Sequence, residues 1–138
     1  MSDLTRVSLS LERSLLERIE QVARRRGYEN RSEFARDLFR QALVEEEWRG
    51  AQDVVGTITL LYDHHVHHLA ERLTDLQHHS HGAVLATTHV HLDRNLCAEM
   101  ILVRGKARSV RKLSDELGRQ RGVLHASLSM GSTGRRLT

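Results

Sequence analysis

Apolar and polar residues alternate at the start of the chain and then recur at helical spacing. Val7, Leu9 and Leu11 alternate with polar residues over 5–11, which predicts a short strand with one apolar face. Apolar residues then recur every three or four positions over 12–26 and again from about 31 to 47, which predicts two helices separated by Gly27. One isolated strand and two helices bury little core, so this segment is expected to form a dimer in which two copies of the strand pair antiparallel.

A second pattern follows a short linker expected at 48–52. β-Rich stretches alternate with helical periodicity in the order strand, helix, strand, strand, helix, strand, which is the βαββαβ order of ferredoxin-like domains. The expected elements are a strand at 54–61, a helix at 64–77, strands at 83–92 and 97–103, a helix at 107–119 and a strand at 122–130. The chain is therefore predicted to be α+β, with domains at 1–49 and 53–131 and a flexible tail at 132–138.

Composition narrows the class of protein. The 138 residues contain no proline and one cysteine, Cys97, which excludes an intramolecular disulfide framework and an all-thiolate zinc site within one chain. No apolar run approaches the roughly 18 residues of a membrane span, and the acidic N-terminus does not resemble a signal peptide. A soluble, cytoplasmic protein with no membrane partner is expected. The net charge of +3 does not by itself indicate a nucleic-acid partner, since residues 1–50 hold ten basic and ten acidic side chains.

Histidine is the unusual component. Nine of the ten histidines lie between His64 and His91, and such clustering is typical of metal sites. His89 and His91 are two apart on a predicted strand and so share a face, and Cys97 follows across a short turn. Copper, zinc and nickel accept this set of donors. The alternative is a pair of solvent-facing imidazoles beside a buried apolar cysteine, and the spacing alone does not decide between the two.

Two other histidine groups have similar alternatives. His78, in the run HHSH at 78–81, could supply a fourth ligand from another subunit, or the run could simply suit the dipole at a helix end. His64 would share a helix face with His67 and His68, as a weaker metal site or, more commonly, as a solvated first turn.

Candidate DNA contacts lie in the N-terminal segment. The polar face of the predicted strand suits a two-stranded ribbon in the major groove, because Arg binds guanine bidentately and Ser contacts base edges. The same face would equally suit solvent. The start of the second helix could bind phosphate, although an ordinary helix cap is the commoner case. These candidates are Arg6, Ser8 and Ser10 on the strand and Asn30, Arg31 and Ser32 at the helix.

The remaining chemistry is weaker. Glu33 and Asp37 are four apart on a helix and could hold a cation, although two solvent-facing acids are the commoner case. An enzyme is not expected, because there is no glycine-rich phosphate loop and no group that would orient a Cys97–His pair.

Two stretches resemble a known family. RVSLSLERSLLERIEQVARRRGYENRSEFARDLFRQAL is similar to ribbon-helix-helix DNA-binding domains. QHHSHGAVLATTHVHLDRNLCAEMILVRG is similar to the ACT-like metal-binding core of nickel-responsive transcriptional repressors of the NikR type. The resemblance implies a homotetramer, a dimer of dimers, that binds double-stranded operator DNA and holds one Ni(II) per subunit in a square-planar site.

The resemblance also implies roles for residues. The nickel ligands would be His89, His91 and Cys97 of one subunit and His78 of another, with Gln77 and Glu99 orienting them. Arg6, Ser8 and Ser10 match the base-reading positions, where the family carries Thr at some, so the target sequence stays open. Glu33 and Asp37 match a cation site found in part of the family, and His64 matches a weaker site.

The function expected from the resemblance is nickel-dependent repression of nickel uptake genes, with nickel raising operator affinity from across a subunit interface. Two alternatives remain. One is a regulator that responds to another transition metal, and the other is a His-rich nickel storage or delivery protein, which would leave the N-terminal half unexplained.

Overall fold

The computed structural model describes residues 3–80 and 83–138, which form two compact units. The first unit comprises Met1–Leu43 with Arg136–Thr138, and the second comprises Val44–Arg135. The boundary between them lies within a helix rather than after it. No helix in the described part of the chain is long and apolar enough to cross a membrane.

The first unit contains helix α1 (Arg13–Arg25) and most of helix α2 (Arg31–Arg49). Gly27, with φ of 79°, ends the first helix, and the Asn30 side chain caps the second by accepting the Glu33 N–H at 2.9 Å. Phe34 is buried and packs on the Tyr28 ring, with centroids 4.9 Å apart. Many other large apolar side chains of this unit are exposed, namely Leu4, Val7, Leu9, Leu11, Leu15, Leu38, Phe39 and Leu43.

The strand predicted at 5–11 is not formed in the single chain. Residues 3–12 have no regular secondary structure and are exposed. A strand needs a neighbour to accept and donate its backbone hydrogen bonds, and none of the described residues of the same chain takes that place.

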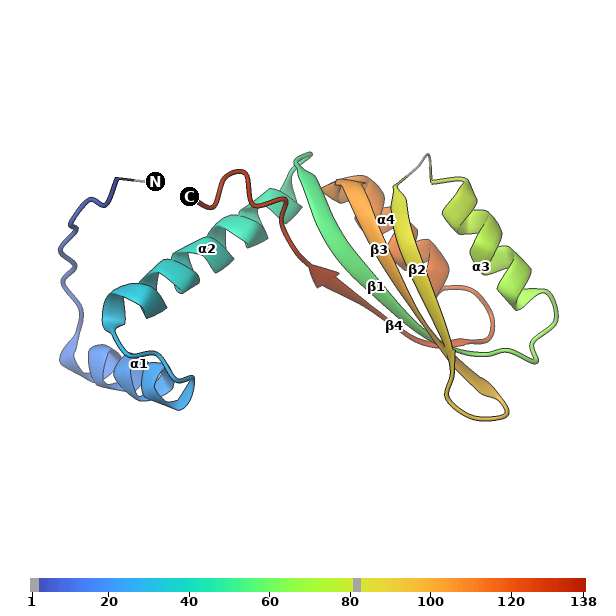
Figure 1. The fold of residues 1–138 in the computed structure, drawn as a ribbon, viewed down its shortest axis with the longest axis horizontal. Coiled ribbons are helices and arrows are strands. Elements are labelled where there is room, and N and C mark those ends of the chain that lie inside the picture. The colour runs from blue at the N-terminus through green and yellow to red at the C-terminus, as the bar shows by residue number, and fades with distance from the viewer. Residues whose placement is uncertain (1–2, 81–82) are drawn as a thin grey trace. The chain divides into compact units, whose positions relative to one another are not determined.

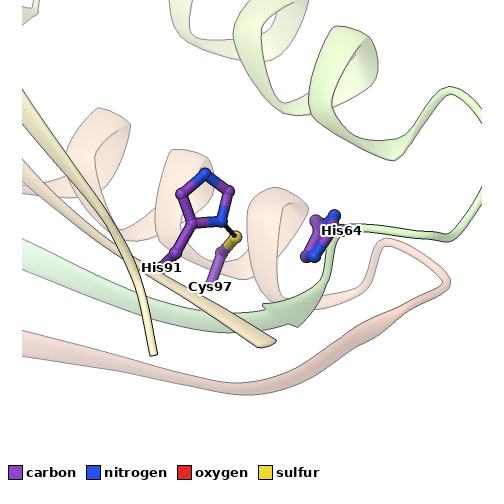
Figure 2. Close-up of side chains that lie close together, drawn as sticks. All are labelled: His64, His91 and Cys97. Atoms are coloured by element: carbon purple, nitrogen blue, oxygen red, sulfur yellow. Dashed lines mark hydrogen bonds between the residues drawn. The ribbon is translucent and has the colours of Figure 1, made fainter. Parts of the chain in front are cut away.

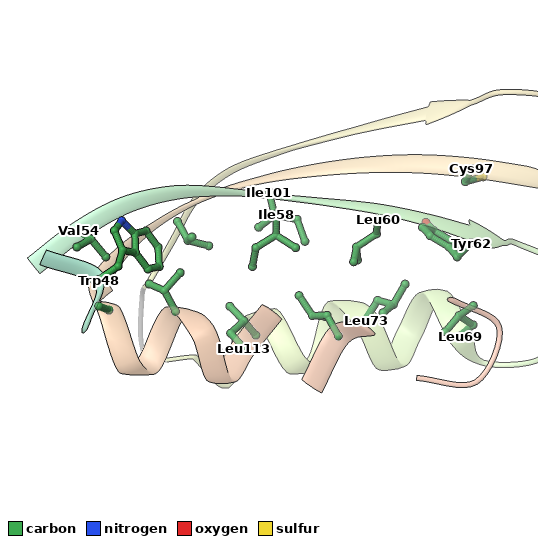
Figure 3. Packing of buried hydrophobic residues seen from close by; sticks show 14 residues of the cluster. Trp48, Val54, Ile58, Leu60, Tyr62, Leu69, Leu73, Cys97, Ile101 and Leu113 are labelled. Atoms are coloured by element: carbon green, nitrogen blue, oxygen red, sulfur yellow. The ribbon is translucent and has the colours of Figure 1, made fainter. Parts of the chain in front are cut away.

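The second unit has the predicted βαββαβ order (Figure 1). Its four strands form an antiparallel sheet in the order β2-β3-β1-β4, and both helices cover one face of it (Figure 3). The elements are β1 (Asp53–Asp63), α3 (Leu69–His78), β2 (Val84–His91), β3 (Leu96–Lys106), α4 (Ala107–Gly118) and β4 (Val123–Met130). The core lies between sheet and helices, where Ile58, Leu60 and Ile101 meet Leu73 and Leu113.

Two expected segment boundaries are wrong. The helix predicted from His64 begins at Leu69, because the amide of His64 donates to Asn95 O and that of His65 to the Asp63 carboxylate, and His68 has a left-handed φ of 59°. His64, His67 and His68 therefore do not share a helix face. The linker predicted at 48–52 is shorter, because α2 continues to Arg49 and Trp48 is buried.

Candidate metal centre

The hairpin of β2 and β3 brings His89, His91 and Cys97 to one face of the sheet. His91 pairs with Cys97 across the two strands, and His89 pairs with Glu99, so all four side chains face the helices. Asp93 shapes the turn between the strands, because its carboxylate accepts the N–H groups of Asn95 at 2.8 Å and Leu96 at 2.9 Å. These hydrogen bonds lower the pKa of Asp93.

Three metal-ligating side chains converge at the end of this hairpin (Figure 2). The donor atoms of His64, His91 and Cys97 all lie within 4.8 Å of one another. Cys97 Sγ is 3.2 Å from His91 Nδ1, and the ring centroids of His64 and His91 are 5.4 Å apart. Within residues 3–80 and 83–138 no other such group of three was found. This cluster combines the buried thiol with two imidazoles, a donor set that suits a borderline-soft divalent cation.

The turn after β1 carries His64 to the cluster. Its backbone N–H donates to Asn95 O at 3.0 Å, and its ring Nε2 hydrogen-bonds to Arg94 O. His65 Nε2 also contacts Arg94 O, at 3.1 Å. The hydrogen bonds join this turn to the tip of the β2–β3 hairpin.

Burial disfavours ionisation of the Cys97 thiol. Its side chain is fully buried, and burial raises its pKa, with smaller contributions from the carboxylates of Asp63, Asp93 and Glu99. A cation in direct contact would favour the thiolate. A divalent metal supplies such a cation and releases the proton on binding.

His89 is held by a buried tyrosine. Tyr62 Oη lies 3.1 Å from His89 Nδ1, and Tyr62 is 1% exposed. Burial, followed by the negative charge of Glu99, raises the pKa of Tyr62 to about 12, so the hydroxyl keeps its proton and can donate it to the imidazole. Tyr62 contacts Nδ1 of His89 and leaves its other ring nitrogen, Nε2, free of Tyr62.

Gln77 and Glu99 join α3 to the strand behind the histidines. Gln77 Nε2 donates to Glu99 Oε1 at 3.1 Å, and Thr87 Oγ1 donates to the same oxygen at 3.4 Å. Gln77 and Glu99 are each 8% exposed. A buried, hydrogen-bonded carboxylate of this kind fixes the strand position opposite His89.

His78 lies apart from the cluster within one chain. It is exposed at the end of α3, beside a cavity that Thr74, Leu85 and Thr87 also line. It is not in the group formed by His64, His91 and Cys97. His81, the last histidine of that run, lies outside the described residues.

Asp37, one of the two acids of the predicted cation site, forms local hydrogen bonds. Both oxygens of Asp37 accept hydrogen bonds, from Tyr28 Oη at 2.6 Å and Arg40 Nη1 at 3.2 Å, and neither Glu33 nor Asp37 joins a three-ligand group among the described residues. The hydrogen bond from Tyr28 is the main reason that the pKa of Asp37 is lowered.

The predicted DNA contacts are at the surface. Arg6, Ser8, Ser10 and Ser32 are exposed. The Arg31 guanidinium pairs with Glu20 at 2.8 Å. The Asn30 side chain caps α2, which is the ordinary role that the sequence also allowed.

Tyr62 is a residue of this site that the sequence reasoning missed. It pairs with Cys97 in the register of β1 and β3, and alternation along β1 places it on the same buried face. The long-range pairing of β1 with β3 was the missing information.

Comparison with known proteins assigns the family. The family model for the NikR C-terminal nickel-binding domain matches residues 55–131, and that for ribbon-helix-helix proteins of the copG family matches residues 5–46. The chain belongs to the NikR family. This membership confirms the predicted α+β fold class with a ribbon-helix-helix domain, and it confirms that the protein is a regulator and not an enzyme.

Relatives of this NikR-family chain are similar over their whole length. A protein of Geobacter metallireducens described as a nickel-responsive regulator is 46% identical over 138 residues, which is 99% of each chain. One of Geobacter sulfurreducens with the same description is 47% identical, again over 99% of each chain, and one of Solibacter usitatus is 46% identical over 97% of each.

A solved structure supports the fold alone. An uncharacterized protein of Thermotoga maritima is 14% identical, with a TM-score of 0.52, over 57% of this chain and 98% of its own.

Proposed function

We propose that this NikR-family protein is a nickel-dependent DNA-binding repressor of nickel uptake genes that acts in the cytoplasm. One observation carries the proposal: a buried thiol, Cys97, lies 3.2 Å from His91 on a hairpin that also carries His89, in a chain whose N-terminal part matches DNA-binding proteins. A storage protein would not need that N-terminal part.

The donor set fits nickel. Thiolate with imidazole suits Ni(II) and Cu(II), and copper should bind at least as tightly, so selectivity depends on geometry and on the metal available in the cell. Nickel would supply a strong contact between side chains of different subunits. The residues that would hold it are His89, His91 and Cys97 of one subunit and His78 of a second, one Ni(II) per subunit.

Tyr62, Glu99 and Gln77 would orient this set. Tyr62 holds the ring of His89, and Glu99 with Gln77 fixes the strand beside it. His64 already lies near His91 and Cys97 in the single chain. We assign it to a weaker site that competes for His91 and Cys97 when the second subunit does not supply His78.

A second copy of the chain suits the exposed apolar surfaces. Strand β2 is at the edge of the sheet, and the face away from the helices exposes Val90, Met100 and Leu102. In the first unit, residues 5–11 pair with no strand among the described residues and expose Val7 and Leu9. Two types of contact between copies, one in each unit, give a homotetramer built as a dimer of dimers.

Pairing of residues 5–11 with a second copy would create the DNA-binding ribbon. Alternation places Arg6, Ser8 and Ser10 on the ribbon face opposite the apolar residues, where they would read base edges of double-stranded operator DNA. Asn30, Arg31 and Ser32 at the start of α2 would bind the phosphate backbone. Glu33 and Asp37 would form a weak cation site only with ligands from outside this chain.

The experiment compares operator affinity with and without nickel. A duplex is first selected by the parent protein with nickel from a random-sequence pool, and its affinity is then measured for the parent, Cys97→Ala and His125→Ala. His125 is the one histidine outside 64–91 and lies on β4, so its variant is the matched control. The parent and His125→Ala should gain at least about tenfold in affinity with nickel, and Cys97→Ala should gain little.

Other outcomes distinguish the alternatives. Several nickel ions per chain with no change in DNA affinity would support storage or delivery. A gain in affinity with another metal and none with nickel would support a different effector. An equal nickel-dependent gain in Cys97→Ala would contradict the proposed ligand set.

A further inference from the structure

The last turn of α2 is part of the core of the second unit. Trp48 is 1% exposed and is among the largest fully buried side chains of the described residues. The boundary between the two units lies between Leu43 and Val44, inside the same helix. One helix therefore begins in the unit that matches DNA-binding proteins and ends within the packed interior of the unit that matches nickel-binding domains.

Three contacts of Trp48 hold this turn in place. Trp48 Nε1 donates to Gly131 O at 2.7 Å, and the N–H of Gly131 donates to Val55 O at 2.9 Å, so the indole is tied to the end of β4 and through it to β1. Arg111 of α4 lies over the indole, with Cζ 5.8 Å from the ring centroid. Its Nε donates to Trp48 O at 3.2 Å, which satisfies a carbonyl at the C-terminal end of α2.

A glycine in β1 makes room for the indole. A Cβ on Gly56 would lie 2.9 Å from Trp48 Cη2 and 3.2 Å from Cζ2, so the ring sits directly on the strand. We call Trp48, Arg111, Gly131 and Gly56 the Trp48 anchor.

Strand β1 joins the Trp48 anchor to the metal centre. Gly56 lies under the indole. Six residues later Tyr62 contacts His89, and His64 lies two residues beyond Tyr62. Figure 3 shows Trp48 at one end of the packed sheet and Tyr62 with Cys97 at the other. Six residues of strand span about 20 Å, so the two sites are distant from each other but share one continuous element.

We propose that the Trp48 anchor positions α2 on the second unit and is required for nickel to change DNA affinity. The inference rests on the proposed function and adds a residue-level route to it. Without the anchor, the last turn of α2 would be free to fray from the core of the second unit. Nickel would still bind, but its effect on the metal-binding unit would no longer reach the DNA-binding helices.

The test separates nickel binding from coupling. Trp48→Ala, Trp48→Phe and Arg111→Ala are compared with the parent and with Leu117→Ala, a control that removes a fully buried core residue of α4 outside the anchor. Nickel binding is followed by the thiolate charge-transfer band, and DNA affinity by the duplex selected with the parent.

Trp48→Ala should bind nickel at the parental stoichiometry and lose about tenfold of the nickel-dependent gain in DNA affinity. Leu117→Ala should keep that gain, which shows that loss of core packing alone does not uncouple the two units. Trp48→Phe and Arg111→Ala each remove part of the anchor and should lose part of the gain, so they decide the question if Trp48→Ala does not fold.

A second readout follows the anchor directly. Amide hydrogen exchange of residues 44–49 is this readout. Nickel should slow the exchange in the parent and leave it fast in Arg111→Ala.

Two results would overturn the inference in distinguishable ways. A parent protein whose DNA affinity does not change with nickel would contradict the proposed function and the anchor together. A parent that responds, with Trp48→Ala or its two partial variants responding equally, would contradict the anchor alone.

Discussion

A hydrogen bond from Tyr28 is the main cause of the lowered pKa of Asp37. Tyr28 Oη donates to its carboxylate at 2.6 Å, and this bond is the largest contribution to the lowered pKa of Asp37. The same bond raises the pKa of Tyr28. The pair joins the turn before α2 to the second turn of that helix, next to Glu33.

Replacing Tyr28 with Phe should raise the pKa of Asp37 toward the ordinary value of about 3.9, because the carboxylate loses its strongest hydrogen bond. A lowered pKa in the folded state stabilises the protein above the unfolded pKa, and this stabilisation is lost as pH falls through the folded value. The loss of stability between about pH 6 and about pH 3 should therefore be smaller in Tyr28→Phe than in the parent.

NMR titration of the Asp37 carboxyl carbon measures the shift, and urea unfolding at the two pH values measures the stability. Arg36→Gln is the control, because Arg36 makes the smallest of the favourable contributions. An unchanged Asp37 pKa in Tyr28→Phe would show that the hydrogen bond does not set it.

Single residues differ in how far the sequence predicts them. The spacing of His89, His91 and Cys97 was enough to place them on one face, since strand periodicity and a short hairpin are local properties. Tyr62 was not predictable in the same way, because its contact with His89 depends on β1 pairing with β3 across more than thirty residues.

At the scale of elements, β1 is the strand on which the second unit is organised. It lies between β3 and β4, its buried positions alternate along the whole strand, and its two ends meet Trp48 and His89. The contact with Trp48 leaves no space at Gly56, so this glycine is required by the close approach of the ring rather than by its backbone conformation.

Gly56→Ala should destabilise the protein by about 1–3 kcal/mol, the usual cost of an extra methyl group in a packed core. The added Cβ would lie 2.9 Å from the buried indole and 3.1 Å from Ser129 O, and neither is free to move. Gly50→Ala is the matched control, because a Cβ there meets nothing within 4 Å. Its effect should stay within about 0.5 kcal/mol.

Urea unfolding followed by the fluorescence of Trp48 gives both values. Equal stabilities of the two variants would show that the ring does not sit on the strand at Gly56.

The sequence predicted the order of the elements, but it misplaced the start of α3 and the end of α2. Period-two and helical patterns predicted each strand and helix of the second unit. The sequence of His64–His68 resembles the start of a helix, but a local bond from His65 to the Asp63 carboxylate and a long-range bond from His64 to Asn95 hold that segment as a turn. The sequence placed Trp48 in the linker. Its position in α2 depends on contacts with Gly131 and Arg111, which are distant in the sequence.

At the scale of the whole molecule, the single chain holds only part of the proposed nickel site. His91 and Cys97 are in contact, His89 is oriented by Tyr62, and His78 is exposed elsewhere on α3. If His78 belongs to the site of a second copy, each site is shared by two chains, and nickel binding is inseparable from assembly.

Mixing of two defective variants tests this sharing. His78→Ala and Cys97→Ala alone should each lack the thiolate-to-nickel charge-transfer band of the parent site. Equal amounts of the two variants are unfolded, mixed and refolded into tetramers. In these tetramers a chain with intact Cys97 can receive His78 from a neighbour with intact His78. Random assembly makes about one site in four complete, so about a quarter of the parental band should return. His78→Ala refolded alone gives the baseline. A mixture of His125→Ala with Cys97→Ala, in which every chain has His78 and half of the chains have Cys97, should give about half of the parental band. A band that stays at baseline in the mixture, although size-exclusion chromatography shows parental assembly, would mean that His78 serves its own chain or does not bind nickel. His64, already beside His91 and Cys97, would then be the residue to replace next.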